Sequence, residues 1–340
     1  MRHRLFALIG ALTTVFTVVV LAMGPAAAQQ AKAPAKAPVK KWSLPHTAWG
    51  DPDLQGVYTF ATETPIQRPT ALGNKDSYTE EEQKQLEEQL KAKQDDNVET
   101  NEHFSYNALW FNSDAGRPTG RTSLVVDPEN GRIPPLTDRA QKVRAEQQAE
   151  LAKRRIGKDT LINTWTDHPE YSRCLARPMP RITQEYNHGV QILQTPGYVH
   201  IFYESMHDVR TIPLDGRPHL DGSLRQWTGD SRGRWEGDTL VVDWANFPDK
   251  MRFQGFPENS MHFTERFTKV DANTVNYVVT VDDPSTWTKP WTFILAWRAD
   301  DPAYTGAEDL FEYACHEGNF RMMEDTLTGS RALREAQSKK

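Results

Sequence analysis

Cysteine is scarce in this sequence, which has only Cys174 and Cys315 among its 340 residues. Two cysteines are too few for a disulfide-rich scaffold. Positive charge is not in excess either, because 40 lysines and arginines stand against 46 aspartates and glutamates. A mildly acidic chain lacks the basic surface that nucleic acids and anionic membranes attract. We therefore expect neither as a partner.

Common catalytic signatures are also missing. The chain has no HExxH or CxxC metal motif and no glycine-rich phosphate loop. The letters GDSRG at 229–233 match the GxSxG pattern, but we expect a turn there rather than a nucleophile elbow. It does have a charged fraction of 25% and ten tryptophans, which is typical of a packed globular protein. These features leave room for an enzyme without an organic cofactor and for a small-molecule binding protein.

Long hydrophobic runs are confined to the N-terminus. Arg2 and Arg4 precede an apolar run over 5–24 and a small-residue site at 26–28, which predicts a secretory signal peptide over 1–28. An uncleaved membrane anchor is the alternative. Cleavage would remove two arginines and no acid, moving the net charge from −6 to −8. We expect a periplasmic or secreted protein with no stable membrane insertion after cleavage.

The remaining chain divides into two parts. Residues 29–44 are rich in Ala, Lys and Pro, which predicts a solvated tether, and 45–335 are expected to form a single domain. In an oxidising compartment we predict a disulfide between Cys174 and Cys315. The alternative is a thiol nucleophile, since Cys315 directly precedes His316.

Short apolar runs recur between about 173 and 316, separated by turns rich in Gly, Asp and Asn. This pattern predicts an all-β fold, in which an antiparallel meander closes into a barrel. We expect 310–317 to be its last strand and 230–233 to be a turn. Two polar segments, 79–96 and 137–155, have helix-forming composition and are expected to pack over the barrel as helices.

Several sequence motifs resemble those of other proteins. They include DPDLQGVY at 51–58, RQWTGDSRGRWEGDTLVVD from 225 and YACHEGN from 313. In these motifs the chain resembles a family of uncharacterised exported bacterial proteins, over most of residues 50–320. The pattern of short strands joined by tight hairpin turns is also similar to that of calycin (lipocalin-like) barrels. This second resemblance implies a fold, and a fold alone does not imply a function.

One connection between strands is crowded with ionisable residues: Glu204, His207 and Asp208. Histidine titrates near neutral pH and an adjacent acid can fix its tautomer, so His207 with Glu204 or Asp208 is the predicted acid–base pair. The alternative is that these loop residues are only solvated. His316 with its neighbouring acid, or Glu265, is the predicted opposite partner.

Glu265 lies in phase with Phe263 and Phe267, so its carboxyl sits on an apolar face. Desolvation would raise the pKa of such a carboxyl and prepare it as a general acid. The competing interpretation is a buried ion pair with one of three arginines, namely Arg210, Arg225 or Arg266.

Substrate-binding residues are predicted from strand alternation and aromatic content. In the strand near 198–204, Tyr198 and His200 share one face, which we expect to line a ligand cavity. The alternative is that this face meets solvent, with Val199, Ile201 and Tyr203 in the core. Arg210 is expected to bind an oxyanion. The full predicted set is Arg210, Tyr198, His200, Trp227, Trp244 and His262.

Together these features predict an exported enzyme that acts on a small apolar or ring-bearing compound by acid–base catalysis. Lyase, isomerase, hydratase and hydrolase chemistry all fit, and no cofactor is required. One alternative is a non-catalytic lipocalin-like carrier or sensor. Another is a metalloenzyme with a divalent metal held by His207, His262 and His316. The oligomeric state is left open.

Overall fold

The computed structural model of the protein describes residues 42–99, 118–156, 159–182, 187–299 and 310–339. The predicted signal peptide and nearly all of the predicted tether lie outside these ranges. Among the described residues, no helix combines the length and the apolar character needed to cross a membrane.

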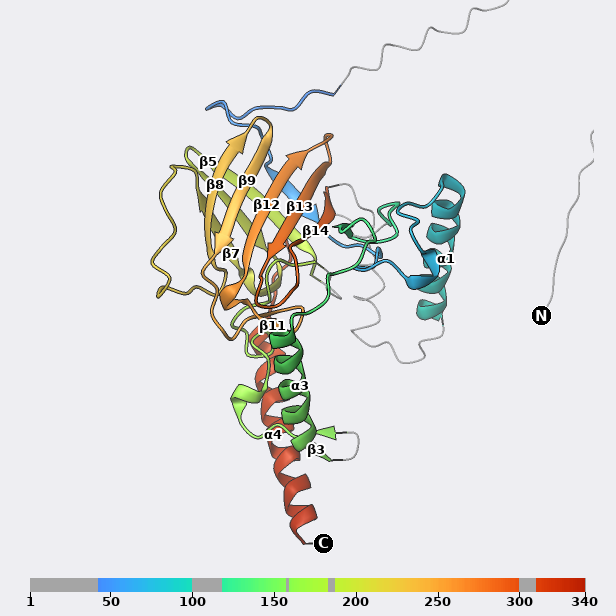
Figure 1. The fold of residues 1–340 in the computed structure, drawn as a ribbon, viewed down its shortest axis with the longest axis vertical. Helices are drawn as coiled ribbons and strands as arrows, with labels where there is room; N and C mark the ends of the chain where they lie inside the picture. Colours follow the sequence, from blue (N-terminus) through green and yellow to red (C-terminus); the bar gives the residue numbers. More distant parts are fainter. Residues whose placement is uncertain (1–41, 100–117, 157–158, 183–186, 300–309, 340) are drawn as a thin grey trace, which may run out of the picture. The chain divides into compact units, whose positions relative to one another are not determined.

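A ten-stranded antiparallel sheet dominates the described part of the chain (Figure 1). Hydrogen-bonded neighbours follow the order β7-β6-β5-β1-β14-β13-β12-β9-β8, and β2 pairs with β14 off this path. The strands are β1 (Gly56–Thr59), β2 (Val125–Asp127), β5 (Gly189–Thr195), β6 (Tyr198–Tyr203), β7 (Val209–Pro213), β8 (Asp230–Glu236), β9 (Thr239–Ala245), β12 (His262–Lys269), β13 (Thr274–Asp282) and β14 (Trp291–Arg298).

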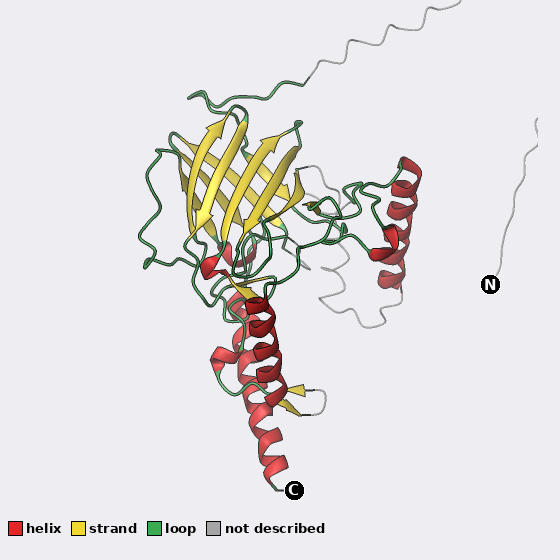
Figure 2. Ribbon diagram, viewed as in Figure 1, coloured by secondary structure: helices red, strands yellow, loops and turns green. Residues whose placement is uncertain are grey.

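A few helices and two short ribbons complete the described structure (Figure 2). The helices are α1 (Glu80–Glu99), α3 (Asp138–Lys153) and α4 (Cys315–Ser338), together with the 3-10 turns η1 (Thr70–Leu72), η2 (Trp165–Asp167), η3 (Ser205–His207) and η4 (Glu258–Ser260). The ribbons pair β3 (Arg155–Ile156) with β4 (Asp159–Thr160), and β10 (Arg252–Phe253) with β11 (Phe256–Pro257). The fold is thus mostly antiparallel sheet, as the turn-punctuated apolar runs predicted.

Strict alternation of side chains explains the long strands. In β13 every second residue from Val275 to Val281 is buried, and the residues between them are partly exposed. The buried faces meet in an aromatic core, where the Trp297 ring lies 4.7 Å from that of Tyr277 and 5.3 Å from that of Phe267. Large side chains therefore fill the inner side of the sheet.

The hydrogen-bonded ladder does not close into a barrel among the described strands, since β7 pairs only with β6 and β8 only with β9. The two end strands nevertheless meet through side chains. Arg210 of β7 donates to the Ser231 hydroxyl of β8 at 3.1 Å. A Cβ added to Gly233 of β8 would lie 2.7 Å from Ile212 Cγ2, so the missing side chain permits this close approach. In place of the predicted closed barrel, the structure has a curled sheet whose end strands, β7 and β8, contact each other through side chains. We call this contact between β7 and β8 the seam.

Two local expectations were wrong. Residues 230–233, expected as a turn, begin β8; its buried positions are Asp230, Ser231 and Gly233, so the strand lacks hydrophobic alternation. Residues 310–317, expected as the last strand, contain the first turn of α4, which begins at Cys315. A strand formed by 310–317 could not pair with β14, because β14 already pairs with β13, β1 and β2.

The two predicted helices form close to their expected bounds, but they differ in packing. Thr137 caps α3 by accepting a hydrogen bond from the Ala140 amide at 3.2 Å, and Ala140 is buried. Arg144 of α3 lies over the Phe256 ring at 5.1 Å. No described side chain of α1 is buried. Of the expected helical cover, only α3 is seen to contribute to the core.

Candidate functional site

The β6–β7 connection holds Glu204, His207 and Asp208, as the sequence indicated. Within it Met206 and His207 adopt φ values of 68° and 53°, a left-handed conformation that is uncommon for residues other than glycine. The tight turn separates the three ionisable groups: Glu204 is buried, Asp208 half-buried and His207 exposed. They therefore meet different partners.

Asp208 forms an ion pair with Arg181, and the Arg181 side chain is almost fully buried. Arg181 also donates to the Ser205 carbonyl at 2.8 Å and lies over the Tyr203 ring at 4.4 Å. Burial raises the pKa of Asp208 to about 6, although the positive charge of Arg181 opposes the shift. Asp208 consequently titrates near neutral pH, as a proton-transfer group requires.

Nothing in the sequence pattern singles out Arg181, because it lies in a proline-rich segment outside any strand. Burial lowers the pKa of this arginine to about 10, while Asp208 opposes the shift. The guanidinium still carries its charge at neutral pH. Arg181 is the residue that connects the predicted acid with the cleft described next.

A cleft of about 300 Å³ opens beside Arg181. Its charged lining consists of Arg177, Arg181 and Arg252. Its remaining lining is mostly apolar or aromatic and comprises Ile66, Tyr171, Pro178, Pro180, Ile182, Phe253 and Gln254. Three guanidinium groups over apolar walls suit an organic anion that has an apolar body.

A second unusual carboxyl lies behind this cleft. Glu258 of η4 is buried, and its Oε1 accepts a hydrogen bond from the amide of Met179 at 3.3 Å. Met179 stands between Pro178 and Pro180, which line the cleft. Glu258 Oε2 is buried with no hydrogen-bond partner among the described residues. Burial raises the pKa of Glu258 well above its ordinary value, which favours the protonated form of this carboxyl.

Glu204 and His207 contact neighbours outside the predicted acid–base pair. The Asn187 side-chain amide donates to Glu204 Oε1 at 2.5 Å. His207 Nε2 accepts a hydrogen bond from the Tyr313 amide at 3.2 Å, which places the ring proton on Nδ1. Tyr313 precedes α4 by two residues. His207 thus links the β6–β7 turn to the start of that helix.

The predicted disulfide between Cys174 and Cys315 is confirmed. It joins the first residue of α4 to the segment that contributes Tyr171 to the cleft. His316, the next residue of α4, is exposed. The alternative of a thiol nucleophile is therefore wrong for this state, since both sulfurs are in the bond.

Glu265 is in a buried ion pair with Arg210, which is one of the two interpretations of its apolar setting. Arg210 Nη1 lies 3.0 Å from Glu265 Oε1 and Nη2 lies 2.5 Å from Oε2. The Tyr277 hydroxyl donates to Oε1 at 2.5 Å. Burial raises the pKa of Tyr277 well above its ordinary value, and the Glu265 charge adds to the shift. Arg210 and Glu265 line neither described pocket, and their opposite charges pair with each other.

His262 lies in a polar cluster on the outer face of the sheet, away from the aromatic core. Asp243 Oδ1 is 2.8 Å from His262 Nε2 and 2.6 Å from His219 Nε2. The other ring nitrogen of His219 is 2.8 Å from Asp230 Oδ2. Burial opposes ionisation of Asp243, but the two histidine hydrogen bonds outweigh it and lower the pKa of Asp243.

The three histidines suggested as metal ligands lie in η3 (His207), β12 (His262) and α4 (His316). His262 contacts Asp243, and His207 contacts the Tyr313 amide. Within the ranges that the structure describes, no group of three or more His, Cys, Asp or Glu residues is arranged to hold a metal ion.

The predicted wall of an internal cavity is also different in the structure. Tyr198 and His200 lie on the outer face of β6, with Val199, Ile201 and Tyr203 in the core. Trp244 is fully buried, and its indole donates to the Thr228 carbonyl at 2.7 Å. Trp227 is half-buried in the loop before β8. These residues pack or face solvent rather than line either described pocket.

Comparison with models of known protein families and with curated proteins finds no match. Among solved structures, the chain is similar to the crystal structure of a mutant of the fluorescent protein UnaG, with 15% sequence identity. The match covers 38% of this chain and 84% of that one, at a TM-score of 0.21. A similarity at that score carries no argument about fold or function.

Proposed function

We propose that the protein binds a small, ring-bearing organic anion in the cleft formed by Arg177, Arg181 and Arg252. The observation that carries this proposal is the combination of three guanidinium groups with aromatic and proline walls in one cleft of about 300 Å³. A cleft of this size is at the lower end of the range for small-molecule sites. It suits a ligand with a single ring.

The chemistry of the lining defines the ligand class. Guanidinium groups recognise carboxylates by paired hydrogen bonds, and they keep their charge at all physiological pH values. Phe253 and Tyr171 offer aromatic surface for a flat apolar group.

Export to the periplasm or beyond remains part of the proposal, supported by the signal-like N-terminus and by the disulfide. A calycin-type barrel remains part of it too, supported by the curled antiparallel sheet.

Binding is tested by isothermal titration calorimetry with benzoate, cyclohexanecarboxylate and acetate as probes. We expect the two ring-bearing carboxylates to bind more tightly than acetate. Replacing the exposed Arg252 by Gln removes one guanidinium and should weaken benzoate binding about tenfold, which corresponds to roughly 1.4 kcal/mol. The matched control is Arg139→Gln, which removes an exposed arginine of α3. Equal affinity of the two variants for benzoate would refute the proposed site.

Acid–base catalysis on the bound anion is the second candidate function, and Asp208 favours it. Its carboxyl has a pKa of about 6 and contacts Arg181, which lines the cleft. A carboxyl with that pKa exchanges protons readily near neutral pH. Elimination, isomerisation, hydration and hydrolysis all use such a group, with Arg177 or Arg252 holding the anionic end of the substrate.

Proton transfer is tested by deuterium exchange. A probe that binds is incubated with the protein in D₂O, and incorporation of deuterium at carbon is followed by NMR. Asp208→Asn should abolish exchange while leaving benzoate affinity within about threefold, a difference of less than 1 kcal/mol. If the unmodified protein binds probes but neither exchanges nor converts any of them, the carrier function is favoured instead.

A further inference from the structure

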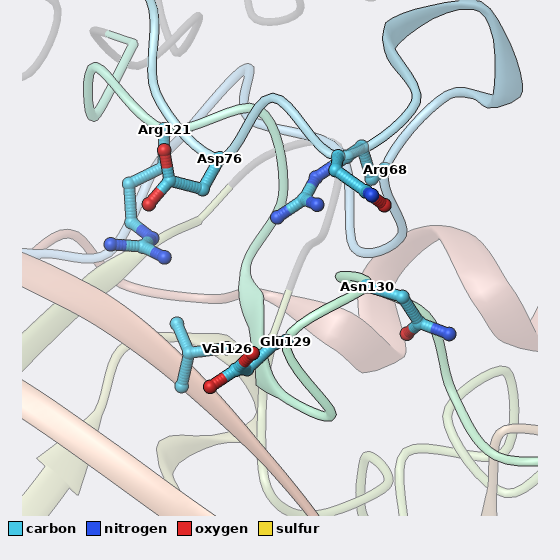
Figure 3. A pocket seen from close by; sticks show the side chains of 7 residues that line it. Arg68, Asp76, Arg121, Val126, Glu129 and Asn130 are labelled. Carbon is cyan, nitrogen blue, oxygen red and sulfur yellow. The ribbon is translucent and has the colours of Figure 1, made fainter.

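A second pocket, of about 540 Å³, is separate from the cleft and uses none of its residues (Figure 3). It is lined by Arg68, Asn74, Asp76, Arg121, Val126, Glu129 and Asn130. All but one of these side chains are polar or charged. The pocket therefore differs in character from the apolar-walled cleft.

Arg68 is the unusual residue of this pocket, because its side chain is 2% exposed and forms no ion pair among the described residues. Its Nε donates to the Thr122 hydroxyl at 3.0 Å, and that hydroxyl donates to the Lys75 carbonyl at 2.6 Å. Its Nη1 is buried with no hydrogen-bond partner in the described structure. A buried guanidinium with an unused donor is costly unless an anion approaches it.

The surrounding chain holds Arg68 in place. The Arg68 amide donates to the Gly131 carbonyl at 2.8 Å. Gly131 has a φ of 69°, and a Cβ at this position would lie 2.9 Å from Arg68 Nε and 2.5 Å from the Ser123 hydroxyl. Only glycine fits here without displacing these groups. The guanidinium is thus positioned in advance, as a binding site requires.

Arg121 supplies a second cation from a different segment of the chain. Its Nε is also buried without a hydrogen-bond partner among the described residues. The exposed side chains of Asn74, Asp76, Glu129 and Asn130 provide oxygen acceptors around the two arginines. Arg68 and Asp76 come from one stretch of the chain, and Arg121, Val126, Glu129 and Asn130 come from a second, so two segments far apart in the sequence line the pocket (Figure 3). Donors for an anion and acceptors for ligand donors therefore share one pocket.

We propose that this pocket binds a small organic carboxylate that also carries an ammonium or hydroxyl donor, with Arg68 and Arg121 holding the carboxylate. The unused donors of the two arginines match a carboxylate. The carboxylates of Asp76 and Glu129 match a donor group elsewhere on the same molecule. The polar lining disfavours the ring-bearing anions assigned to the cleft. This site is independent of the proposed function.

The test uses calorimetric titration of the full protein with glutamate and gluconate, and with acetate and sulfate as simpler anions. We expect glutamate or gluconate to bind at least tenfold more tightly than acetate. Arg121→Gln should weaken that binding about tenfold, while Arg139→Gln leaves it unchanged. Because Arg68 is buried, Arg68→Lys is the second variant; it keeps the charge but loses the planar donors, and it should also weaken binding.

Glu129→Gln tests whether the pocket recognises the donor group of the ligand separately from its carboxylate. It should weaken binding of glutamate or gluconate without weakening that of acetate. Binding of sulfate or acetate alone, or affinities unchanged in both arginine variants, would overturn the proposal. Absence of binding by all four anions would overturn it as well.

Discussion

The buried pair of Arg210 and Glu265 is predicted to hold the sheet together at its seam. Both side chains are at most 1% exposed, and Arg210 also reaches Ser231 on the opposite end strand. Removing one charge leaves the other buried and unpaired, which costs roughly 3–5 kcal/mol. We therefore expect Glu265→Gln and Arg210→Met each to lower the free energy of unfolding by about 4 kcal/mol.

Removing both charges together should cost much less than the sum of the two losses. The double variant Arg210→Met with Glu265→Leu leaves no unpaired charge. It does leave the hydroxyls of Tyr277 and Ser231 without these partners, at a cost of about 1–3 kcal/mol each. The double variant should therefore lose about as much as either single variant, so the coupling energy is about 3–4 kcal/mol.

Urea unfolding followed by tryptophan fluorescence, with the disulfide intact, measures these free energies. Because a loss of 4 kcal/mol is a large fraction of a typical stability, Tyr277→Phe is the milder variant. It removes one hydrogen bond to Glu265 and should cost about 1–2 kcal/mol. Additive losses in the double variant, or a loss below about 1 kcal/mol for Glu265→Gln, would refute a structural role for the pair.

Three further predictions follow from the disulfide and from the two shifted carboxyls. Replacing Cys174 and Cys315 by serine opens a loop with a sequence separation of 141 and should lower the unfolding free energy by about 5 kcal/mol, as measured by urea unfolding. The pKa of Asp208 is raised to about 6 in the folded state, so its contribution favours folding at low pH. Stability should fall by up to about 3 kcal/mol as the pH rises from 4 to 7, and Asp208→Asn should remove this part of the pH dependence. Burial likewise raises the pKa of Glu258, so Glu258→Gln should be more stable than the unmodified protein at pH 8, with a smaller difference at pH 5; thermal unfolding at both values tests this.

Strands with regular alternation were predictable from the sequence, and those with small or polar inward positions were not. The runs that became β5, β6, β7, β9, β12, β13 and β14 have mostly hydrophobic residues at their buried positions, with Gln194, Arg210 and Glu265 as polar exceptions. In β8 the inward positions are Ser231 and Gly233. These residues are small because β7 lies close to them across the seam. A constraint set by a distant strand leaves no local periodicity.

The lining of the cleft could not be predicted from the sequence, because none of its residues was among the predicted site residues and only Asp208 reaches it, through Arg181. Glu204, His207 and Asp208 were identified from their clustering, and the structure places Asp208 against the cleft wall. Arg181, Arg252 and Glu258 come from irregular segments, where neither side-chain orientation nor burial can be judged from the sequence. Their role depends on contacts between segments far apart in the chain.

The seam between β7 and β8 bears on the protein's resistance to aggregation. Strands at the ends of an open sheet expose unpaired amides and carbonyls, which can add strands from other molecules. Here each end strand has the other beside it, and Gly233 allows the approach. The side chains of Ile212 and Leu214 occupy the space beside Gly233. A side chain at 233 would push the two edges apart and offer them to neighbouring molecules, with intermolecular sheet formation as the outcome.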